Sequence, residues 1–563
     1  MLKRPHQFLM VTFSLLGVLV LLLSGCGPTG TPANSGSNAK PVRGGTWIDD
    51  IPNEPNSLIP NAGSSTFNAL VDQALFAPLF YGDKDGHINP GIVSEMPTAT
   101  NGDISADLKT WTFKLRPGLK WSDGQPLNAD DIDYAWKLYN DKNFPTYTTV
   151  GFNLIQSADV SADKLAITFH LSQPFAPFIS IWTDAQAAPL PKHVFSKYTP
   201  DALAKSSENL SPSVVSGPFM MSESRPGDHY TVVRNPNYYR ADEGLPYLDK
   251  IIFVPVRDEN TILKNLQTGS ITSSWFLDVS KMPAYRALTN YNLSINPVTV
   301  NFEMIAINFR NAILGQNREV RQAMAMAIDY ASLIKTARLG TAVPLCIPHG
   351  KGFNPGYQAD APCPKFDPTA ANALLDQNGW AKGRDGVRTK NGQRLEFKYS
   401  TTTGKPWREQ DELIIQSNLK DIGIKLDIQN VPADTFFATF LPSGKHDLAE
   451  YEQTPIYDPD ESTVVACDQI PSASGGGGNY SFYCNKQVDH YLMIEKSSAD
   501  RATRQAAFNQ LHQIYLTDFP IIVLYSPSDP GIAKFTAHNY TPGPEAASET
   551  VNLWEWWCTN GKC

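Results

Sequence analysis

One strand–helix–strand run in the second half of this chain constrains its fold more than any other feature. Residues 395–400 are predicted to form a strand, and a helix predicted to begin near Arg408 is expected to end at Gly423. Residues 424–429 then alternate apolar with charged or polar side chains, and residues 446–452 predict another strand. Strands and a helix in this order indicate a parallel or mixed α/β sheet.

The ends of these predicted strands indicate where a ligand is expected to bind. In sheets of this kind, ligands lie beyond the carboxyl ends of the strands. Those ends fall at residues 401–404 and 450–453. We therefore expect side chains from these two short segments to line a binding site.

Acidic side chains gather at and after the last of these strands. Glu450 and Glu452 occupy alternate positions, so their side chains face the same way. Together with Asp458 and Asp460 they have three possible roles: the carboxylates of a glycosidase, an anchor for the amine of a ligand, or a solvated surface.

Other signs of catalysis or cofactor binding are sparse. The sequence has no Gly-x-Ser-x-Gly elbow, no His-Glu-x-x-His motif and no phosphate-binding loop. Its ten histidines are scattered, with no two at ligand spacing. We therefore expect no enzymatic activity, no cofactor and no bound metal.

The N-terminus is laid out as a secretory signal. A basic tip precedes a mostly apolar run over residues 8–23, and Leu23-Ser24-Gly25-Cys26 follows. These four residues resemble the lipobox of bacterial lipoproteins, whose cysteine is diacylated. The alternative is an uncleaved membrane helix, but the run is shorter than the ~20 residues that span a bilayer. We expect a lipoprotein signal peptide over 1–26, lipidation of Cys26 and a flexible tether over 27–43.

The charge of the chain agrees with export. It has 47 basic and 56 acidic residues, and loss of Lys3 and Arg4 with the signal takes the net charge from −9 to −11. An acidic exported chain is not expected to bind nucleic acid. We expect the mature protein to be held by its lipid on the extracytoplasmic side of the cell membrane.

Six cysteines remain after Cys26, an even number that allows fifteen pairings. Neighbours in sequence suggest local disulfides, which suit an oxidising environment. Zinc is the alternative, but the sequence has no Cys-x-x-Cys motif. The suggested pairs are Cys346–Cys363, Cys467–Cys484 and Cys558–Cys563.

Residues 111–136 form the most distinctive internal stretch. Within it Asn128 is predicted to cap a helix that begins at Ala129, which accounts for Asp130 and Asp131 without acid–base chemistry. The run Leu-Arg-Pro-Gly-Leu-Lys-Trp-Ser-Asp-Gly-Gln-Pro-Leu-Asn-Ala-Asp-Asp closely resembles the signature of bacterial extracellular solute-binding protein family 5. Further matches, in the order of the family, are Ser216–Phe219, Arg234–Tyr239, Leu266–Gly269, Val320–Ala323 with Ala327–Asp329, and Leu374–Trp380.

The resemblance covers about residues 44 to 530 and implies the fold of the family. That fold is an α/β, two-lobed clamp of periplasmic-binding-protein type II with an additional inserted domain, three domains in all. The chain is expected to cross between the lobes near residues 300 and 525, which would form the hinge. The implied ranges are 44–79, 215–300 and 526–563 for lobe I, 80–214 for the inserted domain II, and 301–525 for lobe II, which is domain III.

The resemblance also implies a function. Members of the family include the oligopeptide- and dipeptide-binding proteins of ATP-binding-cassette importers. A monomer of this kind captures its solute by closing two lobes over it, and the closed form docks on the membrane permease. The residues that the resemblance places at the ligand are Ser64, Ser65, Tyr147, Trp275, Thr401, Trp407, Arg408, Glu450, Glu452, Gln453, Thr454, Asp458, Asn479, Tyr480 and Tyr525.

One departure from the family pattern leaves the cargo open. Peptide binders usually carry an acidic residue that pairs with the peptide amine, in or just before the segment matching 454–460, and here the expected place holds Pro455-Ile456-Tyr457. An acidic neighbour, Glu450, Glu452 or Asp458, is the available substitute. If none serves, the cargo is an oligosaccharide, a nickel chelate or another small solute, and stacking on Trp407 and Trp275 would suit a sugar. An exported hydrolase is the alternative of a different class.

Overall fold

The structure is a computed structural model in which residues 41–563 form one compact unit. It describes residues 40–62, 67–183, 185–296, 299–349, 363–455, 458, 460–472, 477–544 and 548–563. The predicted signal peptide, Cys26 and most of the tether lie outside the described residues, and so do Ser64 and Ser65.

A seven-stranded mixed sheet is formed by the first and last parts of this unit. Its central strand β1 runs parallel to both neighbours, and the outer strands pair antiparallel. Trp47 on β1 is fully buried and its ring stacks on Trp556, with 4.5 Å between the ring centroids, so the two ends of the unit share one core. In spatial order the strands are β11 (Tyr291–Ser294), β21 (Gly531–Lys534), β10 (Ser273–Ser274), β1 (Thr46–Ile51), β9 (Lys250–Pro255), β8 (His229–Arg234) and β7 (Phe219–Arg225).

A six-stranded mixed sheet is formed by the second half of the chain, as the sequence predicted. β17 pairs in parallel with β18 and β19, whereas β12 pairs antiparallel with β19 and β20. In spatial order the strands are β13 (Ala342–Val343), β20 (Ile521–Pro527), β12 (Phe302–Ile307), β19 (Leu448–Gln453), β17 (Glu396–Ser400) and β18 (Lys425–Ile428).

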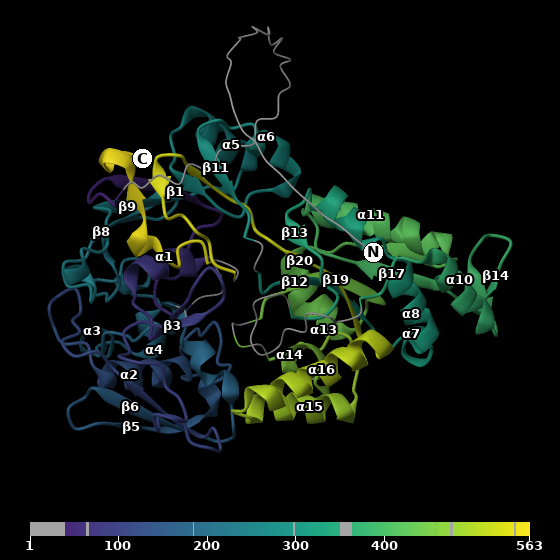
Figure 1. Ribbon diagram of the computed structural model, residues 1–563, viewed down its shortest axis with the longest axis horizontal. Coiled ribbons are helices and arrows are strands. Elements are labelled where there is room, and N and C mark those ends of the chain that lie inside the picture. Colours follow the sequence, from purple (N-terminus) through teal and green to yellow (C-terminus); the bar gives the residue numbers. More distant parts are fainter. Residues whose placement is uncertain are drawn as a thin grey trace, which may run out of the picture. The chain divides into compact units, whose positions relative to one another are not determined.

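Helices cover both faces of the six-stranded sheet. Ile305 and Ile307 on β12 pack with α8 (Arg318–Ala327), α10 (Pro368–Gln377) and α11 (Pro406–Asp421). Met304 and Ala306 point the other way and pack with α15 (Lys486–Ser497) and α16 (Arg501–Asp518), which lie side by side (Figure 1). Because both faces are covered, the strand is almost wholly apolar, which is typical of a buried strand.

The predicted helix starts agree with the structure. The side chain of Asn128 caps α2 (Ala129–Tyr139) by accepting a hydrogen bond from Asp130 N at 2.9 Å. The backbone N of Asn128 in turn donates to the carboxylate of Asp131 at 3.0 Å. These contacts explain Asp131 as a capping residue, whereas the carboxylate of Asp130 pairs with Lys164 at 2.7 Å. The remaining helices are α1 (Asn68–Leu75), α3 (Lys192–Phe195), α4 (Pro200–Leu203), α5 (Glu259–Thr268), α6 (Met282–Arg286), α7 (Ala312–Gln316), α9 (Tyr330–Ser332), α12 (Ala433–Thr435), α13 (Leu441–Ser443) and α14 (Ser462–Val465).

A three-stranded antiparallel sheet lies within the range expected for the inserted domain. Its strands are β4 (Thr110–Lys114), β6 (Ala166–Leu171) and β5 (Ile155–Val160). Phe113 and Phe169 on this sheet belong to the same hydrophobic core as Trp47 on the seven-stranded sheet. The smaller sheets are formed by β2 (Phe80–Gly82) with β3 (Ile88–Pro90), by β14 (Ala381–Lys382), β15 (Arg388–Lys390) and β16 (Gln393–Arg394), and by β22 (Ala537–His538) with β23 (Trp557–Cys558).

The strands can be compared with the predicted domain ranges. All strands of the seven-stranded sheet fall in the ranges predicted for lobe I, and those of the three-stranded sheet fall in 80–214. The six-stranded sheet fits 301–525 except that β20 continues to Pro527, past the predicted limit. Because lobe I and the insertion share one core, the exact domain limits stay a prediction.

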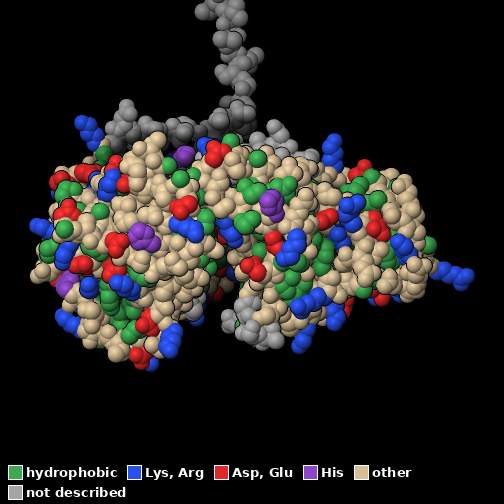
Figure 2. All heavy atoms as spheres, turned by 90° about the horizontal axis from the view of Figure 1, so that it is seen from below, with side chains coloured by type: hydrophobic (Ala, Val, Ile, Leu, Met, Phe, Trp, Pro, Cys, Tyr) green, Lys and Arg blue, Asp and Glu red, His purple; other side chains and the backbone are tan. Residues whose placement is uncertain are grey.

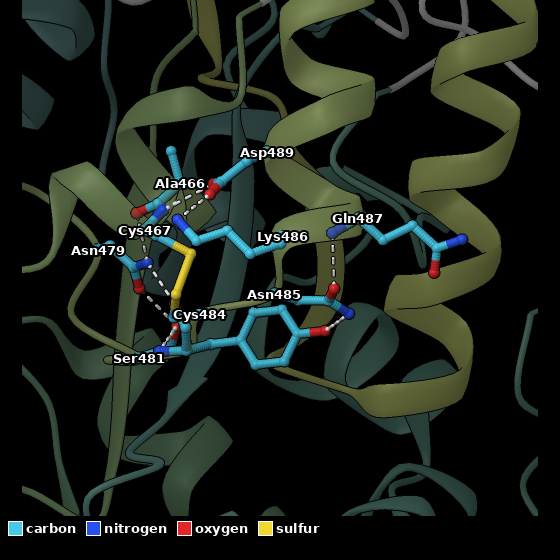
Figure 3. The surroundings of a disulfide bond; sticks show 10 residues. Ala466, Cys467, Asn479, Ser481, Cys484, Asn485, Lys486, Gln487 and Asp489 are labelled. Atoms are coloured by element: carbon cyan, nitrogen blue, oxygen red, sulfur yellow. Dashed lines mark hydrogen bonds and ion pairs between the residues drawn. A yellow bond between two sulfur atoms is a disulfide. The ribbon is translucent and has the colours of Figure 1, made fainter.

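Three disulfides join the pairs of cysteines that the sequence suggested. They link Cys346 to Cys363, Cys467 to Cys484 and Cys558 to Cys563. Figure 3 shows the second of these beside the start of α15. A cross-link of this kind stabilises a chain mainly by restricting its unfolded state.

The surface charge and the apolar character of the helices can be compared with the predictions about nucleic acid and the membrane. On the face drawn in Figure 2, basic and acidic side chains are interspersed without an extended basic patch. None of the helices among the described residues has the length and apolar character needed to cross a membrane.

Candidate ligand-binding site

A cavity of about 290 Å³ lies where elements of the two large sheets meet. One wall comes from the segments after β9 and β10 and includes Arg257, Phe276 and Asp278. The other wall comes from the start of α11 and the end of β19 and includes Lys405, Trp407 and Glu452. This second wall coincides with the strand ends that the sequence predicted as a ligand site. The volume is near the lower end of ~300–1,000 Å³ for ligand pockets.

Charges of both signs line this cavity. Burial raises the pKa of Glu452 to about 8 and that of Asp529 to about 6, and the charge of Asp529 adds to the rise at Glu452. Burial, followed by the nearby Arg408, lowers the pKa of Lys405. Arg338 also lines the cavity. A solute that carries both an ammonium and a carboxylate group matches such a lining.

Arg408, predicted as a ligand residue, lies behind the cavity wall and pairs with Glu303. Its Nε and Nη2 donate to the two oxygens of Glu303 at 2.9 and 3.0 Å, and its Nη1 donates to Thr402 at 2.9 Å. All three side chains are buried. Each of the three guanidinium nitrogens therefore has a partner within the protein, and through these bonds Arg408 orders the wall of the cavity.

Glu450, Thr401 and Tyr525 belong to the same buried group. Tyr399 donates its hydroxyl to Glu450 at 2.7 Å, and Thr401 donates to the backbone carbonyl of Glu450 at 3.0 Å. Tyr525 donates to Asp411 at 2.5 Å. Burial raises the pKa of Glu450 well above its usual range and that of Asp411 to about 8. These predicted ligand residues therefore support the site from behind.

The two predicted stacking tryptophans are already in contact with other side chains. The guanidinium groups of Arg338 and Arg408 each lie 4.5 Å from the ring centroid of Trp407. Trp275 is 3% exposed and packs against Phe276 in the core of the first wall. Trp275 is therefore a core residue, whereas Trp407 lines the cavity with two guanidinium groups close to its ring.

A second cavity of about 120 Å³ contains Gln453 and Thr454, which the sequence also predicted. Val150 and Phe175, from the inserted range, line its other side. Asp458 lies nearby in sequence, but both of its oxygens accept from Arg504, at 2.9 and 2.5 Å. Asp458 is therefore committed to Arg504 and is not available as an anchor for an amine.

Asn479 and Tyr480 lie away from both cavities. Asn479 is fully buried and donates to the carbonyls of Ala466 and Tyr483 at 2.9 and 2.8 Å, beside the Cys467–Cys484 disulfide (Figure 3). The carbonyl of Tyr480 lies 2.9 Å from His446 Nε2. These contacts fix a loop, so packing accounts for both residues.

Tyr147 lies in the middle of the inserted range, and its backbone contacts Asn61, which precedes the predicted Ser64 and Ser65 in sequence. Its backbone N donates to Asn61 at 2.8 Å, and its side chain is 43% exposed. Tyr147 and Asn61 thus bring two parts of the chain together that the sequence predicted to share a ligand surface. Neither lines the two cavities described above.

Sequence reasoning missed one group of side chains. His349, Glu461 and His512 are buried together, and their possible ligand atoms lie within 4.8 Å of one another. The two histidines are 163 residues apart, so no spacing in the sequence signals their contact. The expectation that the histidines are scattered therefore fails for this pair in space.

The two large sheets and the charged cavity at their strand ends define a solute-binding protein. The sequence matches the family described as "Bacterial extracellular solute-binding proteins, family 5 Middle" over residues 95–469. The chain therefore belongs to bacterial extracellular solute-binding protein family 5. It is a binding protein of the kind that serves ATP-binding-cassette transporters, and not an enzyme.

Similar proteins differ in the cargo that they carry. The chain is 26% identical over 563 residues to the oligopeptide-binding protein AppA of Bacillus subtilis, covering 99% of each chain. It is 25% identical over 536 residues to the dipeptide-binding protein DppE of the same organism, covering 90% of this chain and 92% of DppE.

Solved structures share the fold. AppA of B. subtilis in complex with a nonapeptide has a TM-score of 0.74 at 22% identity, covering 92% of this chain and 100% of that one. NikZ of Campylobacter jejuni in complex with Ni(L-His) also has a TM-score of 0.74 at 22% identity, covering 91% and 99%. These similarities confirm the α/β fold class predicted from the sequence.

Proposed function

We propose that this protein captures a short peptide in the cavity that Glu452 lines, with Glu452 as the anchor for the peptide amine. One observation supports this choice above others. Of the three acidic residues considered as substitutes, Glu450 is buried behind the wall and Asp458 is paired with Arg504, whereas Glu452 lines the cavity. The raised pKa of Glu452 and of Asp529 means that a nearby ammonium group would favour their ionised forms.

The opposite charge of a peptide also finds partners in this cavity. Lys405 and Arg338 line it together with Glu452. A peptide terminus that carries a carboxylate would pair with either cation by charge-assisted hydrogen bonds. The oligosaccharide alternative is weaker because Trp275 is buried in the core and the Trp407 ring already has two guanidinium groups close to it.

Capture would proceed by closure of two lobes about a hinge near residues 300 and 525. The two crossing segments are held together by hydrogen bonds, because Ser526 donates to the carbonyl of Asn301 at 2.7 Å and lies 2.5 Å from Thr299 Oγ1. Since residues from both sides line the cavity, bound peptide would favour the closed form. The closed form would then deliver its peptide to the importer.

The mature chain would work at the membrane, held by a lipid on Cys26. The apolar run and the small residues before Cys26 support this proposal. Replacing Cys26 with Ala would release the protein from the membrane fraction into the medium. Retention of the Cys26→Ala variant in membranes would contradict the lipid anchor.

Titration calorimetry with trialanine and with N-acetyl-trialanine tests the peptide proposal. We expect the acetylated peptide to bind at least about tenfold more weakly, since a hydrogen-bonded charge is worth roughly 1.5–3 kcal/mol. Glu452→Gln should weaken trialanine to a similar degree and remove the difference between the two peptides. Glu409→Gln is the matched control, because Glu409 is exposed on α11.

Two results would count against this function. Equal affinity for the two peptides in the unaltered protein would exclude an amine anchor. A Glu452→Gln variant that binds trialanine as tightly as the Glu409→Gln control would exclude Glu452 from that role.

A further inference from the structure

The buried group of His349, Glu461 and His512 is separate from the cavity wall that carries Glu452. His349 follows β13 and lies three residues after Cys346, Glu461 precedes α14, and His512 lies on α16. Each of the three is no more than 4% exposed. Three distant parts of the chain therefore bring one carboxylate and two imidazoles to the same buried place.

The distances within this group match those of metal ligands. His349 Nδ1 lies 3.2 Å from His512 Nε2 and 3.1 Å from Glu461 Oε1, and His512 Nε2 lies 3.6 Å from Glu461 Oε1. In a tetrahedral zinc site with bonds of ~2.0–2.1 Å, neighbouring ligand atoms are roughly 3.3 Å apart. An ion bound equally to all three atoms therefore needs only small movements of the side chains.

Hydrogen bonding by itself leaves the carboxylate poorly satisfied. Both imidazoles lie within 3.6 Å of Glu461 Oε1 and the Tyr515 hydroxyl is also close to this carboxylate, but among the described residues none of these contacts has the geometry of a good hydrogen bond. A buried carboxylate with poorly aligned donors is costly, and a cation at the centre of the triangle reduces this cost.

Buried acidic side chains surround the group. Burial, followed by the charge of Asp460, raises the pKa of Glu495 on α15 well above its usual range, so this carboxyl group keeps its proton. Asp458 is paired with Arg504. A divalent ion would therefore balance the carboxylate of Glu461 itself.

We propose that His349, Glu461 and His512 form a site for a divalent transition-metal ion, for which zinc is the best fit. Two histidines and one carboxylate are a ligand set that zinc accepts, and a fourth position remains for water. His349 and Glu461 line the cavity of about 120 Å³, which provides room for that water. The ion would tie α16 to Glu461 and to His349, and so would stiffen the wall of the cavity of about 120 Å³.

Zinc uptake by the untagged protein tests the proposal directly. After dialysis against a chelator, without a reductant so that the disulfides stay closed, zinc is titrated in competition with a chromophoric chelator. We expect one tightly bound zinc per chain and a rise in the unfolding temperature of roughly 3 °C at a hundredfold excess over Kd. Cobalt in place of zinc should give the strong visible absorption of a tetrahedral site.

Single substitutions identify the ligands. His349→Ala and His512→Ala should each abolish stoichiometric zinc binding and the shift in unfolding temperature. His87→Ala is the matched control, because Asp83, Asp85 and His87 form an exposed group of the same kind. Circular dichroism of the metal-free variants checks that they are folded. If a histidine variant does not fold, Glu461→Gln replaces it in the zinc titration, because glutamine keeps the shape of the side chain.

Any of three results would overturn the site. They are the absence of stoichiometric zinc uptake by the unaltered protein, zinc binding that survives His349→Ala and His512→Ala, and loss of binding in His87→Ala alone. The first would leave a hydrogen-bonded triad in place of a metal site, and the last would assign the ion to the surface group.

Discussion

Both large sheets bury carboxyl groups, but they treat them differently. In the seven-stranded sheet, Asp49 on β1 accepts from Ser273, and the buried Glu549 accepts from Tyr540. Among the described residues, neither carboxyl group forms an ion pair with a lysine or arginine. In the six-stranded sheet, Glu303 on β12 is paired through two hydrogen bonds with Arg408.

The difference shows which sheet carries buried charge. Burial is the main cause that raises the pKa of Asp49 and Glu549 far above the usual range, so both are held neutral and act as hydrogen-bonding groups in a core. Arg408 stays charged, and its field acts on Glu452 at the cavity as well as on Glu303. The charged sheet is thus the one whose edge carries the proposed ligand anchor.

Removing the buried cation of Arg408 should have the largest effect on the stability of the protein. Arg408→Met leaves Glu303 buried without a partner, and breaking such a pair costs about 3–5 kcal/mol of the free energy of unfolding. Urea unfolding followed by circular dichroism measures the loss. Lys405→Met is the control, because Lys405 is a half-buried cation one turn away without a recorded ion pair.

A double variant sharpens this test. Replacing Glu303 and Arg408 together by Met removes both charges, so it should be more stable than Arg408→Met. A loss below about 1 kcal/mol in Arg408→Met, or no recovery in the double variant, would mean that the pair does not hold the wall together.

The stability of the protein should fall as the pH rises from about 5 to 8. Burial raises the pKa of Asp411 in the folded state to about 8, well above its value in the unfolded chain. The folded state therefore keeps a proton that the unfolded state loses, so the associated stability is complete at low pH and is lost as the pH rises through about 8. Each such proton gives a slope of about 1.4 kcal/mol per pH unit.

Variants assign this slope to one sheet or the other. The free energy of unfolding is measured by urea unfolding at pH 5, 6, 7 and 8. Asp411→Asn should reduce its slope against pH by the amount that corresponds to about one proton, and Glu549→Gln, near the seven-stranded sheet, should reduce it by a similar amount. A slope unchanged by both variants would show that neither buried acid retains its proton in the folded state.

Local signals in the sequence were enough to predict much of the second sheet. Gly423 follows the end of α11 with a positive φ of 83°, as expected, and Asp367 caps α10 by accepting from Ala370 N. Alternation alone predicted β18. The strand ends also indicated Glu452, because the rule for ligand sites in α/β sheets depends on topology and not on side-chain contacts.

The rest of the site depends on contacts between distant residues, which leave no local pattern. Trp275 and Tyr525 were predicted at the ligand, yet an aromatic residue at a cleft and one in a core look alike in sequence. Arg408 finds its partner Glu303 105 residues away. His349 and His512 meet only through the packing of α16.

The smallest predicted effect comes from removing single tyrosine hydroxyl groups, one beside each large sheet. Tyr399→Phe and Tyr540→Phe each remove one hydroxyl group that donates to a buried carboxyl group, Glu450 or Glu549. Each should cost about 1 kcal/mol of the free energy of unfolding, the usual value for one hydrogen bond. Stability alone therefore cannot distinguish the two sheets.

Trialanine affinity should distinguish them. Glu450 lies on β19 two residues before Glu452, so Tyr399→Phe should weaken binding slightly, by less than about tenfold, or 1.4 kcal/mol. Tyr540→Phe should leave the affinity unchanged, because neither Tyr540 nor Glu549 lines the cavity. Equal losses of affinity in the two variants would contradict the assignment of the anchor to the six-stranded sheet. Removal of the Tyr540 hydroxyl, which is distant from Glu452 in sequence and outside the cavity lining, would then affect trialanine binding as much as removal of the Tyr399 hydroxyl.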